Sequence, residues 1–243
     1  MTVHTGTRRV VCLGDSITRA QVSVDYIRML KNRTAGRPYA FTNAGVNGDL
    51  AYNVLQRLDP VIEQQPDVVV LIGTNDANAS LSEKNALMMR KTKKLPVTPT
   101  IGWYRQNLAA ITERLTRETG ARVALLSLPV LGQQLASEPA RRSGAYSEVV
   151  KETAAMYGAA YLPLHERQVG HLLASDDVAS RIALRDGTAL IKRTAARHFL
   201  LGQSFDGIAR RRGLALTTDF IHQNSRGATM IADLVEDFLG TLG

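Results

Sequence analysis

Two segments near opposite ends of the chain carry residues that could act as a nucleophile and its base. Ser16 follows an apolar run and lies where a helical pattern begins. Asp219 and His222 lie three residues apart, just before the last helical pattern. A serine nucleophile requires a base, and the base requires an acceptor that orients it. These residue types therefore fit acyl transfer through a covalent serine intermediate.

Two further positions could stabilise the negative charge that serine attack creates on a carbonyl oxygen. Gly48 lies in a glycine-rich loop, and Asn75 follows a run of β-branched residues. The backbone N–H groups of Gly48 and Ser16 and the side-chain amide of Asn75 are suitable donors for an oxyanion. Each donor would contribute roughly 3 kcal/mol of transition-state stabilisation, by analogy with measured oxyanion-hole donors.

Each of these residues also has an ordinary structural explanation. Ser16 could be only a helix N-cap, since serine favours that position. Gly48 could only permit a turn, Asn75 could cap a helix or turn, and His222 could be a surface histidine. The strand-to-helix turn at Ser16, taken alone, favours the N-cap explanation. The nucleophile interpretation depends on the other positions lying nearby.

Alternating strands and helices are expected to position these residues. The run Val68–Ile72 is apolar on both faces, which is typical of a central strand in a parallel sheet. The carboxyl ends of parallel strands face one crevice, so we expect Ser16, Gly48 and Asn75 to meet there. The expected strands are residues 9–14, 39–44, 68–72, 122–128 and 159–164. The expected helices are residues 17–35, 51–58, 104–119, 143–157 and 225–239, the last capped by Asn224 or Ser225.

Four blocks in chain order resemble the GDSL/SGNH hydrolase family: Gly14-Asp15-Ser16, Asn43–Gly48, Gly73–Asp76 and Asp219-x-x-His222. The resemblance implies a three-layer α/β/α sandwich with a flavodoxin-like five-stranded parallel sheet. It also implies an esterase or lipase. In that family the corresponding positions make Ser16 the nucleophile, His222 the base, Asp219 its orienting carboxylate, and Ser16, Gly48 and Asn75 the oxyanion hole.

Two departures from the family pattern lie next to these blocks. Ile17 follows Gly-Asp-Ser where leucine is common, and Gln223 follows the histidine where many members have proline. No residues have the spacing of a metal site, and the interpretation requires no cofactor. The expected partner is a small-molecule ester, with small acyl or acetyl esters favoured.

We expect a single domain over residues 1–243, with insertions at 77–100 and 165–218 that flank the crevice. Loops at that end of a sheet commonly determine which substrate enters. Residues Leu87–Met89 could line an acyl site or pack the first insertion onto the body, and the second explanation is favoured.

The net charge of +8 raises the alternative of a nucleic-acid partner. Basic residues cluster at 90–94, 141–142 and 210–212, but aromatic residues make up only 5% of the chain. Base stacking of the kind that single-stranded nucleic acid requires is therefore scarce, and a solvated basic face is expected. The alternative function is a basic nucleic-acid-binding protein on a degenerate hydrolase scaffold, with residues 199–216 as a helix-turn-helix. A flavodoxin-like anion binder is disfavoured because no phosphate-binding glycine motif is present.

The chain has one cysteine, Cys12, which falls in an expected buried strand. No apolar segment resembles a signal peptide or reaches the length of a membrane span. These observations favour a cytoplasmic protein without a transmembrane segment.

Overall fold

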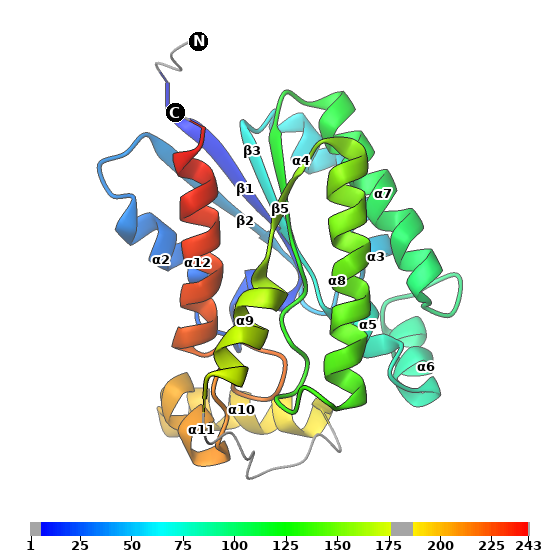
Figure 1. Cartoon of the computed structure of the whole chain (residues 1–243), viewed down its shortest axis with the longest axis vertical. Coiled ribbons are helices and arrows are strands. Elements are labelled where there is room, and N and C mark those ends of the chain that lie inside the picture. The colour runs from blue at the N-terminus through cyan, green and yellow to red at the C-terminus, as the bar shows by residue number, and fades with distance from the viewer. Residues whose placement is uncertain (1–5, 176–186, 243) are drawn as a thin grey trace.

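A five-stranded parallel sheet forms the centre of the computed structural model, which describes residues 6–175 and 187–242 (Figure 1). The strand order is β2-β1-β3-β4-β5, so the chain reverses direction across the sheet between β1 and β3. Val10 of β1 pairs with Phe41 of β2 and with Val68 of β3. The expected α/β architecture is confirmed. The strands are β1 (Arg8–Gly14), β2 (Tyr39–Gly45), β3 (Val68–Ile72), β4 (Arg122–Leu126) and β5 (Ala160–Leu162).

Helices cover both faces of the sheet, because side chains along each central strand alternate between two buried clusters. In β1, Val11 and Leu13 face one cluster, and Val10 and Cys12 face the other. The first face packs against α3 (Ala51–Gln56), α4 (Asp59–Glu63), α7 (Ile101–Glu118) and α8 (Glu138–Tyr157). The second packs against α2 (Tyr26–Arg33), α9 (Leu164–Leu173) and α12 (Ser225–Gly240).

Local capping sets the ends of α8, the longest helix among the described residues. The side chain of Ser137 accepts a hydrogen bond from the Ala140 N–H, and a proline occupies the first turn of α8. Gly158, with φ of 65°, ends the helix in the left-handed conformation. The helix therefore begins at Glu138, five residues before the expected range 143–157. The expected range followed the apolar repeat, and the Ser137 cap lies before that repeat begins.

The prediction of a single helix over residues 17–35 is wrong, because two separate helices occupy this range. A short helix α1 (Ser16–Arg19) ends at Ala20, which is left-handed with φ of 60°, and α2 begins separately. The segment between them contacts the loop that precedes α12, where the Val24 N–H donates to the carbonyl oxygen of Gln223 at 2.9 Å. This tertiary contact overrides the local helical pattern.

The two expected insertions are largely helical where they are described. Residues 77–100 contain most of α5 (Asn75–Ala79) and all of α6 (Glu83–Thr92); residues 165–218 contain α10 (Gly187–Leu201) and α11 (Phe205–Arg212), while 176–186 lie outside the described residues. Met89 packs in a small apolar cluster, whereas Leu87 is 54% exposed, so packing explains Met89.

Within residues 6–175 and 187–242, no helix is both long enough and apolar enough to cross a membrane.

Candidate active site

Ser16 begins α1 immediately beyond the carboxyl end of β1. A Cβ atom at Gly14 would lie 2.2 Å from the carbonyl oxygen of Ile72, so only glycine allows this approach between β1 and β3. The side chain of Asp15 accepts a hydrogen bond from the Ile17 N–H at 2.9 Å and caps α1. The cap is therefore Asp15, and the hydroxyl of Ser16 is not used for capping.

Three polar side chains from the two ends of the chain form one hydrogen-bonded series. Nε2 of His222 lies 2.9 Å from Oγ of Ser16. Nδ1 of His222 lies 2.9 Å and 3.1 Å from the two carboxylate oxygens of Asp219. All three residues are buried. The structure thus brings Ser16, His222 and Asp219 together in the order that nucleophile activation requires.

Asp219 favours the protonated form of His222. Burial has the largest single effect and acts against the charged imidazolium. The charge and hydrogen bond of Asp219, together with the charge of Asp15, outweigh burial and raise the pKa of His222 above its usual value. The imidazole accepts a proton from a serine only when it is neutral. Once it has accepted that proton, the same carboxylate stabilises the imidazolium.

The loop from Asp219 to His222 is a closed turn with a strained backbone. The Thr218 N–H donates to the carbonyl oxygen of His222 at 2.8 Å, and Oδ1 of Asp219 accepts from the His222 N–H at 2.9 Å. Phe220 has φ of 73°, a conformation that costs energy for any residue except glycine. Its buried ring is held in an apolar cluster with Leu190, Ala209 and Leu214.

Asp15 ties the end of β1 to the end of β3. Its Oδ2 accepts hydrogen bonds from the Thr74 N–H at 2.8 Å, the Thr74 hydroxyl at 2.9 Å and the Asn75 amide at 3.0 Å. Burial raises the pKa of Asp15, against the opposing effect of these hydrogen bonds. The Asn75 amide also donates to the carbonyl oxygen of Asp49 at 3.1 Å. Both hydrogens of the amide are thus engaged within the protein.

Gly48 lies in the loop after β2 and has φ of 75°, which favours glycine. Within the described residues, no hydrogen bond joins Gly48 to Ser16, and neither backbone N–H donates to a protein acceptor. Nζ of Lys93 holds the loop by pairing with Asp49 at 2.7 Å and donating to the carbonyl oxygen of Asn47 at 2.9 Å. The loop is therefore anchored while two N–H donors stay available.

The sequence interpretation missed the cations that hold this loop. Lys93 belongs to the basic cluster 90–94, which was expected to be solvated, yet it forms this ion pair. Arg57 contacts the other carboxylate oxygen of Asp49 at 2.7 Å and donates to the carbonyl oxygen of Gly14 at 3.0 Å. The available signal was Asp49 itself, because a carboxylate in a glycine-rich loop requires partners if it is buried.

Arg212 is a third missed cation, and for it the expectation of a solvated basic face is wrong. It is 8% exposed, and its guanidinium donates to the carbonyl oxygen of Thr218 at 2.6 Å and to the Thr194 hydroxyl at 2.7 Å. Burial lowers the pKa of Arg212, and the charge of Asp219 opposes this effect. Arg212 therefore braces the loop that carries Asp219 and His222.

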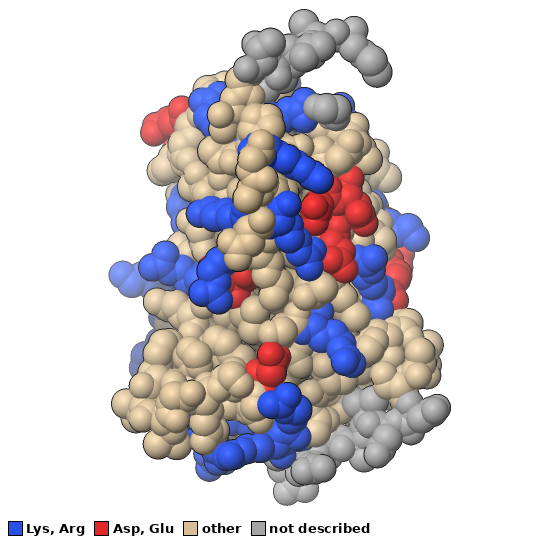
Figure 2. All heavy atoms as spheres, turned by 90° about the vertical axis from the view of Figure 1, so that its left-hand side faces the viewer, with Lys and Arg blue, Asp and Glu red and all other residues tan. Residues whose placement is uncertain are grey.

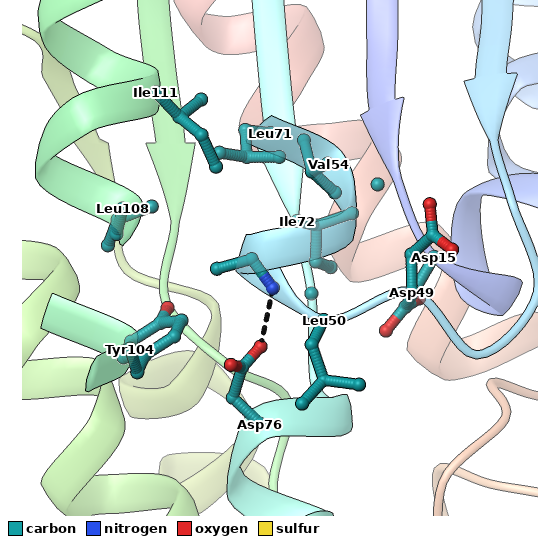
Figure 3. Close-up of a pocket in the computed structure, with 13 residues that line it drawn as sticks. Asp15, Asp49, Leu50, Val54, Leu71, Ile72, Asp76, Tyr104, Leu108 and Ile111 are labelled. Atoms are coloured by element: carbon teal, nitrogen blue, oxygen red, sulfur yellow. Dashed lines mark hydrogen bonds between the residues drawn. The ribbon is translucent and has the colours of Figure 1, made fainter. Parts of the chain in front are cut away.

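A small cavity lies at the carboxyl ends of β1 and β3, lined by three carboxylates and by apolar side chains (Figure 3). Its volume of about 20 Å³ is close to the space that one water molecule needs. The Ala51 N–H donates to Asp76 at 2.8 Å, and burial raises the pKa of Asp76 to about 7. The cavity is too small for an acyl chain. Its carboxylates are Asp15, Asp49 and Asp76.

Solved structures of esterases and acylhydrolases resemble this fold over nearly its whole length. An acetyl xylan esterase, AlAXEase, has a TM-score of 0.64 and 18% identity, covering 95% of this chain and 98% of that one. The acetylxylan esterase Axe2 from Geobacillus stearothermophilus has a TM-score of 0.64 and 17% identity, with coverage of 97% and 95%. A lipase/acylhydrolase from Enterococcus faecalis has a TM-score of 0.61 and 20% identity, with coverage of 96% and 95%. At these identities the likeness shows the fold.

Comparison with curated proteins finds no match. A family model, in contrast, matches residues 12–229, a range that contains all four blocks singled out in the sequence. Its description is the GDSL-like Lipase/Acylhydrolase family. Because the match spans most of the 243 residues, the chain belongs to the GDSL-like lipase/acylhydrolase family and is a carboxylic ester hydrolase.

Proposed function

We propose that this protein hydrolyses small acyl or acetyl esters with Ser16 as nucleophile, His222 as general base and Asp219 as its orienting carboxylate. The observation that carries the proposal is the hydrogen-bonded series from Ser16 Oγ through both ring nitrogens of His222 to Asp219. Asp219 binds Nδ1 and thereby favours the tautomer whose Nε2 can accept the serine proton.

In the first half-reaction, Oγ of Ser16 bonds to the ester carbonyl carbon while its proton passes to Nε2 of His222. The carbonyl electron pair moves onto oxygen and forms a tetrahedral oxyanion. Collapse of this intermediate breaks the bond to the alcohol, which leaves with the proton from Nε2. A water molecule then gives its proton to Nε2 and attacks the acyl-serine, and the same sequence releases the acid and restores Ser16.

The oxyanion would be stabilised by the backbone N–H groups of Ser16 and Gly48 and by the Asn75 amide. The two backbone groups have no competing protein acceptor in the described residues. Asn75 differs, because its amide already donates to Asp15 and to the carbonyl oxygen of Asp49. We expect the longer contact, to Asp49, to be exchanged for the oxyanion as charge develops.

Replacement of Asn75 by alanine is expected to lower kcat by roughly 10²- to 10³-fold, because one oxyanion donor is lost. KM should change little, since a donor to developing charge acts mainly in the transition state. Steady-state kinetics on p-nitrophenyl acetate measures both parameters. Asn107, a buried residue whose amide donates to the carbonyl oxygen of Trp103 within α7, provides a matched asparagine-to-alanine control outside the proposed oxyanion hole. Equal loss of kcat in both variants would contradict a role for Asn75 in stabilising the oxyanion.

A fluorophosphonate probe tests the proposed function directly, because it phosphonylates a serine that an adjacent base activates. We expect labelling of the native protein, with the modified peptide mapping to Ser16, and no labelling after denaturation. A chain-length series of p-nitrophenyl esters should then give the highest kcat/KM for acetyl or another short acyl group. The presence of acetylxylan esterases among the similar structures supports this order. Labelling at another serine, or none, would contradict the assignment of the nucleophile.

A further inference from the structure

The end of helix α10 carries three large apolar side chains that are turned to solvent. Phe199, Leu200 and Leu201 are 64%, 80% and 66% exposed, and they directly precede the left-handed Gly202. Elsewhere among the described residues, large exposed apolar side chains occur singly or, at Leu87 and Met88, as a pair, and scattered ones are normal on a protein surface. Three in succession at one helix end form a contiguous apolar surface, which we call the α10 tip, and such surfaces mark interaction sites.

Basic side chains lie beside the α10 tip. Arg193, Arg197 and Leu201 are spaced by four residues, so they form one row along the helix. Lys192 and Leu200 belong to the adjacent row. Helix α11 packs against α10, and exposed arginines on α11 add to this charge. Both helices lie at the lower end of the molecule in Figure 1, and Figure 2 shows basic side chains there beside an uncharged surface. The five exposed cations are Lys192, Arg193, Arg197, Arg210 and Arg211.

Basic charge exceeds acidic charge across α10 and α11, which together we call the α10–α11 unit. Between residues 187 and 213 the sequence contains six basic residues and one acidic residue, Asp206. Asp206 is already engaged, because its two carboxylate oxygens accept hydrogen bonds from Ser225. No ion pair involves the five exposed cations within the described part of the chain. The unit therefore presents uncompensated positive charge around an apolar tip.

We propose that the α10–α11 unit docks on an anionic membrane surface, with the α10 tip entering the headgroup region and the five cations contacting anionic headgroups. Apolar side chains at a helix end and flanking lysine or arginine are the combination that interfacial helices use. Charge argues against a second copy of this chain as the occupant, because two such units would repel each other. The apolar tip argues against nucleic acid, because phosphate backbones offer nothing to Phe199, Leu200 or Leu201.

The docking unit contacts the loop that carries two of the proposed catalytic residues. Leu190 of α10 packs with Phe220, and Arg212 of α11 donates to the carbonyl oxygen of Thr218. Docking on a membrane is a separate property from ester hydrolysis, so it is tested without an activity assay.

Cosedimentation with extruded vesicles tests the proposal. The protein should bind vesicles of equal parts phosphatidylcholine and phosphatidylserine, release with added salt, and fail to bind pure phosphatidylcholine. The double variant L200D/L201D should lower the partition coefficient at least roughly tenfold, because two apolar contacts are replaced by charges that the anionic surface repels. The control L87D/M156D places the same charges at two exposed apolar positions outside α10 and should bind better than L200D/L201D.

A second pair of variants distinguishes the effect of charge on the docking unit from the effect of the protein's net charge. R193E/R197E and K91E/K151E change the net charge equally, at positions that are all exposed. We expect the first pair to weaken binding at least roughly tenfold more than the second. Absence of binding by the native protein, or equal losses in each variant and its control, would overturn the proposal. So would a dimer in light scattering that L200D/L201D abolishes, or salt-sensitive binding to duplex DNA that L200D/L201D leaves unchanged. Circular dichroism verifies that each variant is folded.

Discussion

Replacement of Ser16 by alanine should lower kcat/KM for a small chromogenic ester by about 10⁴-fold or more. The reason is the loss of the only hydroxyl in contact with Nε2 of His222 among the described residues. Residual turnover above the uncatalysed rate would come from binding and from the remaining oxyanion donors. The measurement is steady-state hydrolysis of p-nitrophenyl acetate, together with the free energy of unfolding from a denaturant titration.

The unfolding measurement separates the nucleophile from the helix-cap interpretation. Asp15 caps α1, so S16A should leave the free energy of unfolding nearly unchanged. Ser137 caps α8 with its hydroxyl, so S137A should cost about 1 kcal/mol of stability and leave kcat/KM intact. Turnover retained by S16A would refute the proposed role of Ser16. A large stability loss in S16A would point instead to a structural serine.

Substitution of Asp219 by asparagine is expected to lower kcat by about 10³- to 10⁴-fold with little change in KM. The amide keeps the shape of the side chain, and its oxygen can still accept from the His222 N–H. Its NH₂ group, however, cannot accept from Nδ1, so the ring no longer favours the tautomer that the mechanism requires. The comparison of kcat and KM for the native protein and D219N measures this effect.

The same variant should move the acidic limb of the pH profile. Asp219 raises the pKa of His222 in the native protein, so activity should be present above that raised pKa and be lost as the pH falls through it. In D219N the opposing effect of burial remains while the charge of Asp219, the larger favourable effect, is gone, so the limb should shift to lower pH. Asp233, an exposed carboxylate that pairs with Arg33 on α2, is the control, and D233N should leave the limb in place. An unshifted limb in D219N would show that Asp219 does not set the protonation of His222.

Local patterns were sufficient to predict the strands of the sheet, and the same patterns led to the residues that we propose for the site. The apolar run Val68–Ile72 is fully buried as a central strand, as its composition requires. Ser16, Asn75 and His222 each lie beside a signal that operates over a few residues: the end of a strand, or the start of a helix. Such signals depend on backbone geometry, and local sequence largely determines that geometry.

The features that escaped prediction depend on contacts between residues far apart in the chain. The helix expected over 17–35 breaks because Val24 pairs with Gln223, and Arg212 is buried because Thr218 and Thr194 fold around it. The engagement of both hydrogens of the Asn75 amide likewise depends on residues from two other segments. Periodicity and composition carry no information on such pairings, because they describe each segment alone.

The hydrogen bond between Ser16 and His222 joins residues 206 positions apart, and this separation has a consequence for biosynthesis. A nascent chain exposes Ser16, the proposed nucleophile, when β1 and α1 emerge from the ribosome, but His222, the proposed base, is translated 206 positions later. Until then the serine lacks the partner that would activate it. During refolding, esterase activity should return only when this long loop closes, which is among the slower steps for a chain rich in distant pairings. Regain of activity thus reports on completion of the fold.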